Sequence, residues 1–139
     1  MTLKMLGKKS SNIRQRLAFF DYDITYVRNS HGFREREFSD VDWNNSILLL
    51  GCSNVYGVGL KIEHPIPRLL ENFFKVPVIN LGIPGSSTEL PVFNSFQIFK
   101  SGYRPRAIIH AWTNLDRYTY FINIKNRECV SYVPRIKRL

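Results

Sequence analysis

Three apolar runs along the chain each end in a short loop of small and polar residues. The runs cover residues 46–50, 77–81 and 107–112. The loops that follow them are Gly51-Cys52-Ser53-Asn54, Gly82-Ile83-Pro84-Gly85-Ser86-Ser87 and Thr113-Asn114-Leu115-Asp116. A continuous apolar run is typical of a parallel strand that is covered on both faces. Parallel pairing would place all three loops at the carboxyl edge of one sheet, where ligands bind in open α/β folds.

A helix is predicted in each interval between these strands. Residues 63–74 have the spacing of one apolar helical face, formed by Ile66, Leu69, Leu70 and Phe73. Residues 86–88 offer an N-cap to a second helix, which Gly102 would end. Because right-handed crossovers join parallel strands in this order, the pattern predicts an α/β fold with a short parallel sheet.

The flanking segments have weaker patterns. Residues 13–19 are predicted to be partly helical, residues 19–28 alternate as a strand does, and residues 33–42 are charged and irregular. A C-terminal β-hairpin is predicted from β-forming residues at 118–124 and 128–133. The expected organisation is a basic arm over residues 1–18, one α/β domain over residues 19–134 and a basic tail over residues 135–139.

The chain of 139 residues carries a net charge of +9 that is concentrated near its two ends. Eight of the twenty Lys and Arg residues lie in residues 1–16 and 135–139, which contain no acidic residue. Such segments attract nucleic acid, acidic proteins or anionic membranes without sequence preference, or serve as solubilising ends. Between them the chain is nearly neutral, and its composition is that of an ordinary soluble domain.

The sequence contains no feature that indicates export, a membrane span or a cofactor. No apolar segment has the length of a signal peptide or of a transmembrane helix, so we expect a cytoplasmic protein, or one in a virion assembled there. Cys52 and Cys129 match no metal-ligand or disulfide spacing and are interpreted as buried thiols. The sequence at 57–59, G-V-G, lacks the third glycine and the acidic partner of a dinucleotide fingerprint.

The three loops contain the groups that an acyl-transfer site needs. Ser53, on a tight turn after a buried strand, can present its hydroxyl. The Gly82 N–H and the Asn114 side-chain amide are suitable oxyanion donors. Each residue alone is common in turns for structural reasons. Their order at one predicted sheet edge is what indicates a site.

Four segments together resemble the SGNH (GDSL-type) hydrolases. They are G-C-S-N-V-Y-G-V-G at 51–59, N-L-G-I-P-G-S-S at 80–87, W-T-N-L-D at 112–116 and the lead-in N-S-H-G-F-R at 29–34. The resemblance implies a flavodoxin-like three-layer α/β/α fold and hydrolysis of an ester or acyl group, with an acylated carbohydrate as one substrate class. It implies that Ser53 is the nucleophile, and that the Ser53 N–H, the Gly82 N–H and the Asn114 side chain form the oxyanion hole.

The sequence departs from the family's pattern at two points. Cys52 stands where the family has an aspartate. The family's histidine base lies in a late D-x-x-H element, and the sequence contains no such element. Of the three histidines present, His110 is expected to pack in or beside the core, His64 to be exposed, and His31 to lie in a turn. Because a serine without a base is a poor nucleophile, we expect an incomplete or weakly active site.

Three interpretations follow. The leading one is an SGNH-like serine hydrolase domain shortened at its C-terminus. The alternative is an inactive SGNH scaffold that serves as a structural or binding module, of phage or mobile-element origin. The third is a protein that associates with nucleic acid through its basic ends. In each case a sheet that ends after its third parallel strand exposes one edge, so we expect self-association or a partner chain that completes the sheet.

Overall fold

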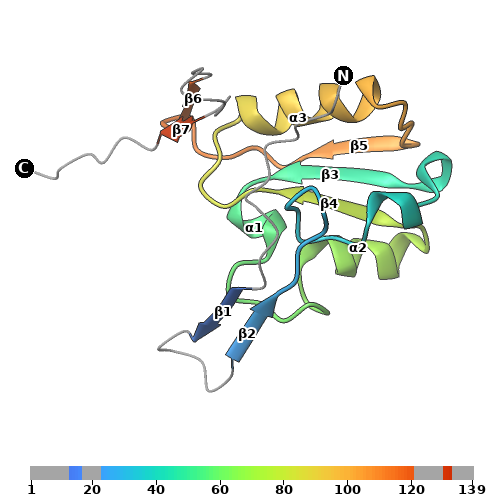
Figure 1. The fold of residues 1–139 in the computed structure, drawn as a ribbon, viewed down its shortest axis with the longest axis horizontal. Coiled ribbons are helices and arrows are strands. Elements are labelled where there is room, and N and C mark those ends of the chain that lie inside the picture. The colour runs from blue at the N-terminus through green and yellow to red at the C-terminus, as the bar shows by residue number, and fades with distance from the viewer. Residues whose placement is uncertain (1–12, 17–22, 121–129, 133–139) are drawn as a thin grey trace, which may run out of the picture.

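A three-stranded parallel sheet forms the centre of the structure (Figure 1). The computed structural model describes residues 13–16, 23–120 and 130–132. The strands are β3 (Ile47–Gly51), β4 (Val78–Gly82) and β5 (Ala107–His110), in the order β4-β3-β5. Gly51 pairs with Gly82, and β5 ends beside them at His110. The three apolar runs are therefore parallel strands, and the predicted α/β class is confirmed.

Helices cover both faces of this sheet. α2 (Ile66–Phe74) connects β3 to β4, and α3 (Glu89–Lys100) connects β4 to β5 (Figure 1). Leu48 and Leu50 of β3 cluster with Ile98 of α3, whereas Leu49 packs on the other side with Leu70 of α2. A one-turn helix, α1 (Ser53–Tyr56), follows β3 and contacts β3 and β4. Burial on both faces explains why β3 and β4 read as continuous apolar runs.

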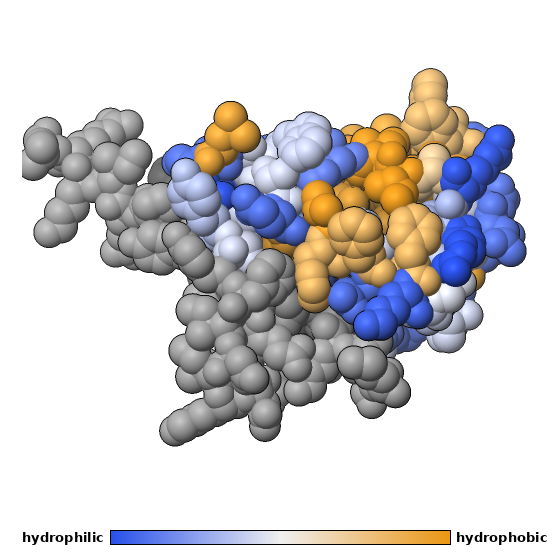
Figure 2. All heavy atoms as spheres, turned by 90° about the horizontal axis from the view of Figure 1, so that it is seen from above, coloured by the Kyte–Doolittle hydropathy of each residue, from blue (hydrophilic) through white to orange (hydrophobic). Residues whose placement is uncertain are grey.

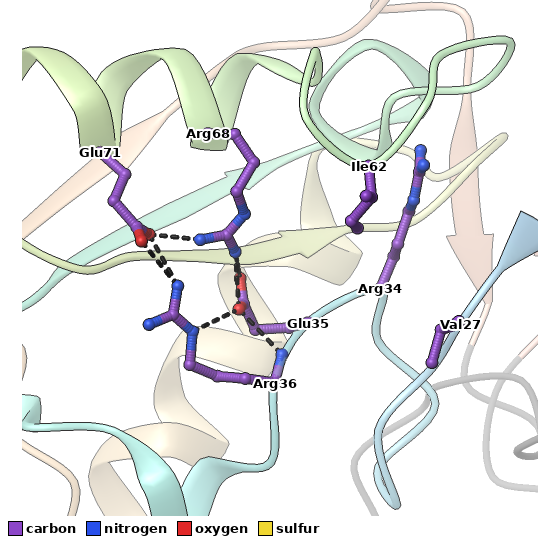
Figure 3. Close-up of a pocket in the computed structure, with 7 residues that line it drawn as sticks. All are labelled: Val27, Arg34, Glu35, Arg36, Ile62, Arg68 and Glu71. Carbon is purple, nitrogen blue, oxygen red and sulfur yellow. Dashed lines mark hydrogen bonds and ion pairs between the residues drawn. The ribbon is translucent and has the colours of Figure 1, made fainter.

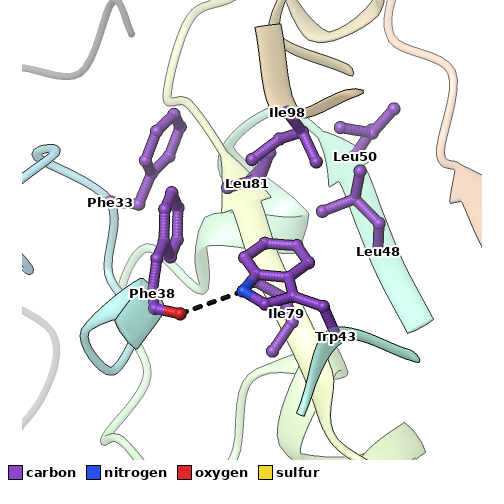
Figure 4. Packing of buried hydrophobic residues seen from close by; sticks show 8 residues of the cluster. All are labelled: Phe33, Phe38, Trp43, Leu48, Leu50, Ile79, Leu81 and Ile98. Atoms are coloured by element: carbon purple, nitrogen blue, oxygen red, sulfur yellow. Dashed lines mark hydrogen bonds between the residues drawn. The ribbon is translucent and has the colours of Figure 1, made fainter. Parts of the chain in front are cut away.

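The segment before β3 supplies the aromatic part of the core (Figure 4). It is largely irregular, as predicted, with two short 3-10 turns, η1 (Phe38–Asp40) and η2 (Trp43–Asn45). The Trp43 indole packs edge-on against the Phe38 ring, with 5.4 Å between ring centroids, and its Nε1–H donates to the Phe38 carbonyl over 2.9 Å. Satisfying the indole N–H in this way allows tryptophan to be buried.

Carboxylates close the outer edge of β4. Glu35 has a side chain that is 1% exposed, and it accepts a hydrogen bond from the Asn80 N–H over 2.7 Å. Glu71 accepts one from the Val78 N–H over 3.1 Å. These two amides alternate along the strand and would otherwise be unpaired at the sheet edge. An edge closed in this way cannot pair with another strand.

Two arginines neutralise these carboxylates (Figure 3). Arg68 pairs with both Glu35 and Glu71, and Arg36 pairs with Glu35 over 3.1 Å and with Glu71 over 2.7 Å. Burial by itself would raise the pKa of Glu71, but the Val78 N–H and the two guanidinium groups hold that pKa below its ordinary value. The network joins the segment before β3 to α2 and to β4.

Helix α2 begins at Ile66 rather than at residue 63, and the prediction of one buried apolar face is wrong for part of it. Ile66, Leu69 and Phe73 are 40%, 54% and 78% exposed. The ion pairs made by Arg68 and Glu71 on another side of the helix fix its rotation about its axis. That rotation leaves these apolar side chains uncovered by the residues that the structure describes.

Two pairs of short antiparallel strands flank the central sheet. β1 (Ile13–Arg16) pairs with β2 (Asp23–Tyr26), so the predicted partial helix is wrong at residues 13–16. Pairing with β2 supplies backbone partners, whereas a short isolated helix is marginal. The alternation predicted for β2 holds, since Ile24 and Tyr26 are buried and Thr25 is exposed.

The second flanking pair lies where the sequence predicts a hairpin. β6 (Tyr118–Tyr120) pairs antiparallel with β7 (Val130–Tyr132). The connection between them, residues 1–12 of the predicted arm and the predicted basic tail lie outside the described residues. Within the part of the chain that the structure describes, no helix has the length and apolar character needed to cross a membrane.

We predict that Glu35→Ala lowers the free energy of unfolding by about 3 kcal/mol or more. The buried Asn80 N–H loses its partner, and Arg68 and Arg36 are left to share the single carboxylate of Glu71. Urea denaturation followed by circular dichroism measures this loss. The matched control is Glu37→Ala, which removes exposed hydrogen bonds to Ser30 and should cost only about 1 kcal/mol. Equal losses for the two variants would contradict the role assigned to the network.

Candidate active site

The second predicted loop bonds to Gly51, the last residue of β3, and the residue that follows β5, Ala111, lies beside it. Two groups of the second loop donate to the Gly51 carbonyl. They are the Ile83 N–H, over 3.0 Å, and the Ser86 hydroxyl, over 3.4 Å. On the side of the third loop, a Cβ built on Gly51 would lie 3.2 Å from the Ala111 Cβ, and it would lie 2.5 Å from the Val55 Cγ2. A side chain at this position would therefore clash with α1 and with the residue that follows β5.

Ser53 is the first residue of α1 and is partly exposed. The Ser53 carbonyl accepts hydrogen bonds from the Gly57 N–H over 2.9 Å and the Val58 N–H over 3.1 Å, which closes the turn. Gly57 ends the helix with a φ of 78°, a conformation that glycine adopts at little cost. The predicted tight turn is thus a single helical turn that places Ser53 at the carboxyl edge of the sheet.

Cys52 connects the first loop to the third. Burial by itself raises the pKa of the Cys52 thiol, but hydrogen bonds from the Thr113 hydroxyl, the Asn54 N–H and Ser53 outweigh this effect and lower the pKa. The Ser53 hydroxyl donates to the Cys52 Sγ over 3.9 Å. The position where the resemblance calls for a carboxylate is therefore held by a thiol that ionises more readily than usual.

Arg117 holds the third loop in place. Its Nη1 donates to the Thr113 hydroxyl over 3.1 Å, and its backbone N–H reaches the Asn114 carbonyl over 3.4 Å. The Asn114 residue is exposed. Because Thr113 also bonds to Cys52, Asn114 follows directly after a residue that contacts the first loop.

Gly82 is buried and has a packing role in addition to the predicted one. A Cβ on Gly82 would lie 2.3 Å from the backbone nitrogen of Tyr56, so α1 rests directly on the end of β4. The Gly82 N–H donates to the Asn80 Oδ1 over 2.9 Å. This amide could bind an oxyanion only by giving up its bond to Asn80.

The three histidines occupy different places. His110 ends β5 and stacks on Trp112 with 4.2 Å between ring centroids, and burial lowers its pKa. His31 stacks on Phe38 at 4.7 Å, and His64 is exposed. Within the described part of the chain, the Ser53 hydroxyl bonds to sulfur and to none of the three imidazoles.

Sequence reasoning assigned no role to Arg34, which the structure places behind the loop that follows Ser53. The side chain is fully buried, and its guanidinium donates to the carbonyls of Tyr56, Gly57 and Leu60 over 3.2, 2.6 and 2.7 Å. It also lies over the Tyr26 ring, 4.7 Å from the centroid. Burial lowers its pKa. The only sequence signal for this residue is its place at the end of the N-S-H-G-F-R lead-in.

A pocket of about 350 Å³ opens on the other side of Arg34, against the ion-pair network (Figure 3). Val27 and Ile62 complete its lining. Ser53, Gly82 and Asn114 do not line this pocket, so it is separate from the candidate active site. Among the residues that the structure describes, no cluster of histidine, cysteine and acidic side chains is arranged to hold a metal ion.

Comparisons with known proteins do not assign the chain to a family. No family model matches it, and neither the curated proteins nor the solved structures contain a match. The candidate active site therefore depends on its own geometry and on the resemblance of the four sequence segments.

We predict that Thr113→Val raises the pKa of Cys52, because it removes a hydroxyl that donates to the thiolate. The rate of alkylation by iodoacetamide should fall at pH 7, and its pH midpoint should move upward. The measurement uses protein carrying Cys129→Ser, so that one thiol reacts. Thr25→Val, at an exposed position on β2, is the control and should leave the midpoint in place. An unchanged midpoint in Thr113→Val would contradict the contact between the two loops.

Proposed function

We propose that this chain is an SGNH-like serine hydrolase domain that cleaves an ester or an acyl group. The observation that carries the proposal is the contact among the three loops: Ile83 and Ser86 bond to Gly51, and Thr113 bonds to Cys52. These contacts lie at the edge of the sheet where the segments bearing Ser53, Gly82 and Asn114 follow their strands. The strand order β4-β3-β5 is also the order in which a flavodoxin-like sheet begins. Together with helices on both faces, this order supports a flavodoxin-like three-layer fold.

The proposed reaction is acyl transfer through a covalent intermediate. Ser53 Oγ attacks the substrate carbonyl, and the hydroxyl proton passes to an acceptor. The Ser53 N–H and the Asn114 amide stabilise the oxyanion, and the Gly82 N–H joins them after releasing Asn80. The alcohol leaves with a proton, and water then releases the acid from the acyl-enzyme.

The Ser53 hydroxyl is bonded to a poor proton acceptor. The contact that the structure gives the Ser53 hydroxyl is the Cys52 Sγ at 3.9 Å, and sulfur is a weak hydrogen-bond acceptor. Loss of one member of a catalytic triad lowers the rate by several orders of magnitude and leaves only residual catalysis. We therefore expect slow turnover, most readily seen with activated esters.

The weak proton acceptor beside Ser53 also favours the alternative, a binding or structural module that keeps the SGNH scaffold and has no hydrolase activity. In that case the loops at the carboxyl edge of the sheet bind an acylated ligand, such as an acetylated carbohydrate, and do not cleave it. Binding through the basic ends to nucleic acid stays a third proposal, which salt-dependent retention on heparin would support.

We predict that Ser53→Ala lowers the hydrolysis of short-chain p-nitrophenyl esters by at least about tenfold, because the attacking oxygen is lost. The rate of nitrophenolate release measures this change. Ser95→Ala is the matched control, since the Ser95 hydroxyl bonds within α3 to the Val92 carbonyl and should not affect turnover.

A parallel assay of Cys52→Ala separates the hydroxyl from the neighbouring thiol as the source of turnover. Full activity of Ser53→Ala, with activity lost in Cys52→Ala, would overturn the role of Ser53. Equal and negligible rates in the wild type and in both variants would favour the inactive scaffold.

A further inference from the structure

The two edges of the central sheet have opposite character. The carboxylates of Glu35 and Glu71 accept hydrogen bonds from amides of β4, as described above. Along β5, by contrast, no strand in the described ranges pairs with the outer edge. The strand, Ala107–His110, contains no acidic residue, lysine or proline, which are the common means of protecting an edge. As far as the described ranges go, its backbone is thus open to a further strand.

Both faces of β5 are apolar and partly uncovered. Ile108 is 42% exposed and Ile109 is 37% exposed, and they point to opposite faces of the sheet. Trp112, just beyond the strand, is 69% exposed. The apolar sequence of β5 would suit an interior strand, but β5 is an edge strand of the described sheet.

Helix α3 adds to this apolar surface. Ile108 pairs with Leu48, which packs with α3, so Ile108 and α3 share one face of the sheet. On that face α3 exposes Phe96 (66%) and Phe99 (37%). Figure 2, which looks onto this face, shows apolar side chains gathered between hydrophilic ones. Apolar patches rimmed by polar residues commonly mark protein interfaces.

We propose that the outer edge of β5 pairs antiparallel with β5 of a second copy of this chain, joining the two sheets into one. A two-fold axis perpendicular to the sheet relates the copies, so α3 of each lies on the same side. Opposite residues in an antiparallel pair point to the same face, and pairing Ile108 with Ile108 of the second copy satisfies this condition. The inference is independent of the proposed hydrolase function.

The charges around β5 favour this occupant and this orientation. Arg104 and Arg106 precede the strand and are exposed, whereas Trp112 and Asp116 follow it and are also exposed. In the register centred on Ile108, Arg104 lies opposite Trp112 of the second copy, which suits a cation–π contact. Asp116 of each copy also lies toward the end of β5 at which the other copy carries Arg104 and Arg106. A parallel arrangement would instead place the arginines of the two copies side by side, which is unfavourable.

The test is sedimentation equilibrium of the full chain at micromolar concentration. We expect the wild type to be a dimer, and Ile108→Glu to raise the dissociation constant at least about tenfold, because two carboxylates would face each other at the axis. Ile108→Lys should have the same effect. An equimolar mixture of the two variants should dimerise again, since the substituted residues are then of opposite charge. Circular dichroism checks that each variant is folded.

The matched control is Phe73→Glu on the exposed side of α2, which should leave the dimer intact. A monomeric wild type would overturn the proposal, and so would a dimer that survives Ile108→Glu. A dimer lost in Phe73→Glu but kept in both Ile108 variants would move the interface to α2 and overturn it as well. Failure of the mixture to associate would exclude the register centred on Ile108.

Discussion

The buried carboxylate of Glu35 is the constraint on which much of this structure depends. It bonds to the Asn80 N–H of β4, to Arg68 of α2 and to its neighbour Arg36. A buried charge is tolerated only when it is paired and hydrogen-bonded, so these elements must stay together. The bond to β4 closes one edge of the sheet, and the bond to Arg68 sets the rotation of α2. The preceding residue in the chain, Arg34, supports the loop after Ser53.

The parallel strands could be predicted because burial on both faces leaves a direct trace in the sequence. β3 is a continuous apolar run and β4 is apolar except for Asn80, and both strands are buried in the structure. β5 has the same pattern yet is largely exposed. The apolar pattern of a segment indicates that it is suited to burial. It does not indicate whether other parts of the protein cover the segment.

The charged residues before β3 could not be placed from the sequence. Arg34 and Glu35 lie in a stretch that has the composition of a solvated loop, but both are buried. The Leu60 carbonyl that Arg34 binds and the Arg68 side chain that Glu35 binds lie more than twenty residues away along the chain. Likewise, β1 forms because β2 is there to pair with it. Long-range partners decide these outcomes, and hydrophobic periodicity contains no information about them.

The sequence could predict where the candidate site lies in the fold, but not which of its groups are available for catalysis. Parallel strands end at the same edge, so the proximity of the loops follows from topology. The bonds from Gly82 to Asn80 and from Ser53 to Cys52 depend on side-chain rotamers. Those bonds determine which groups are available for chemistry, and they appear only at atomic detail.

The sealed edge of β4 also limits the size of any assembly that grows by strand addition. A sheet with two open edges can add copies at both ends and extend into a fibre. Here one end is capped by Glu35 and Glu71, so growth through β5 stops once two copies have met. The carboxylates that stabilise one side of this small sheet thereby protect the protein from open-ended polymerisation.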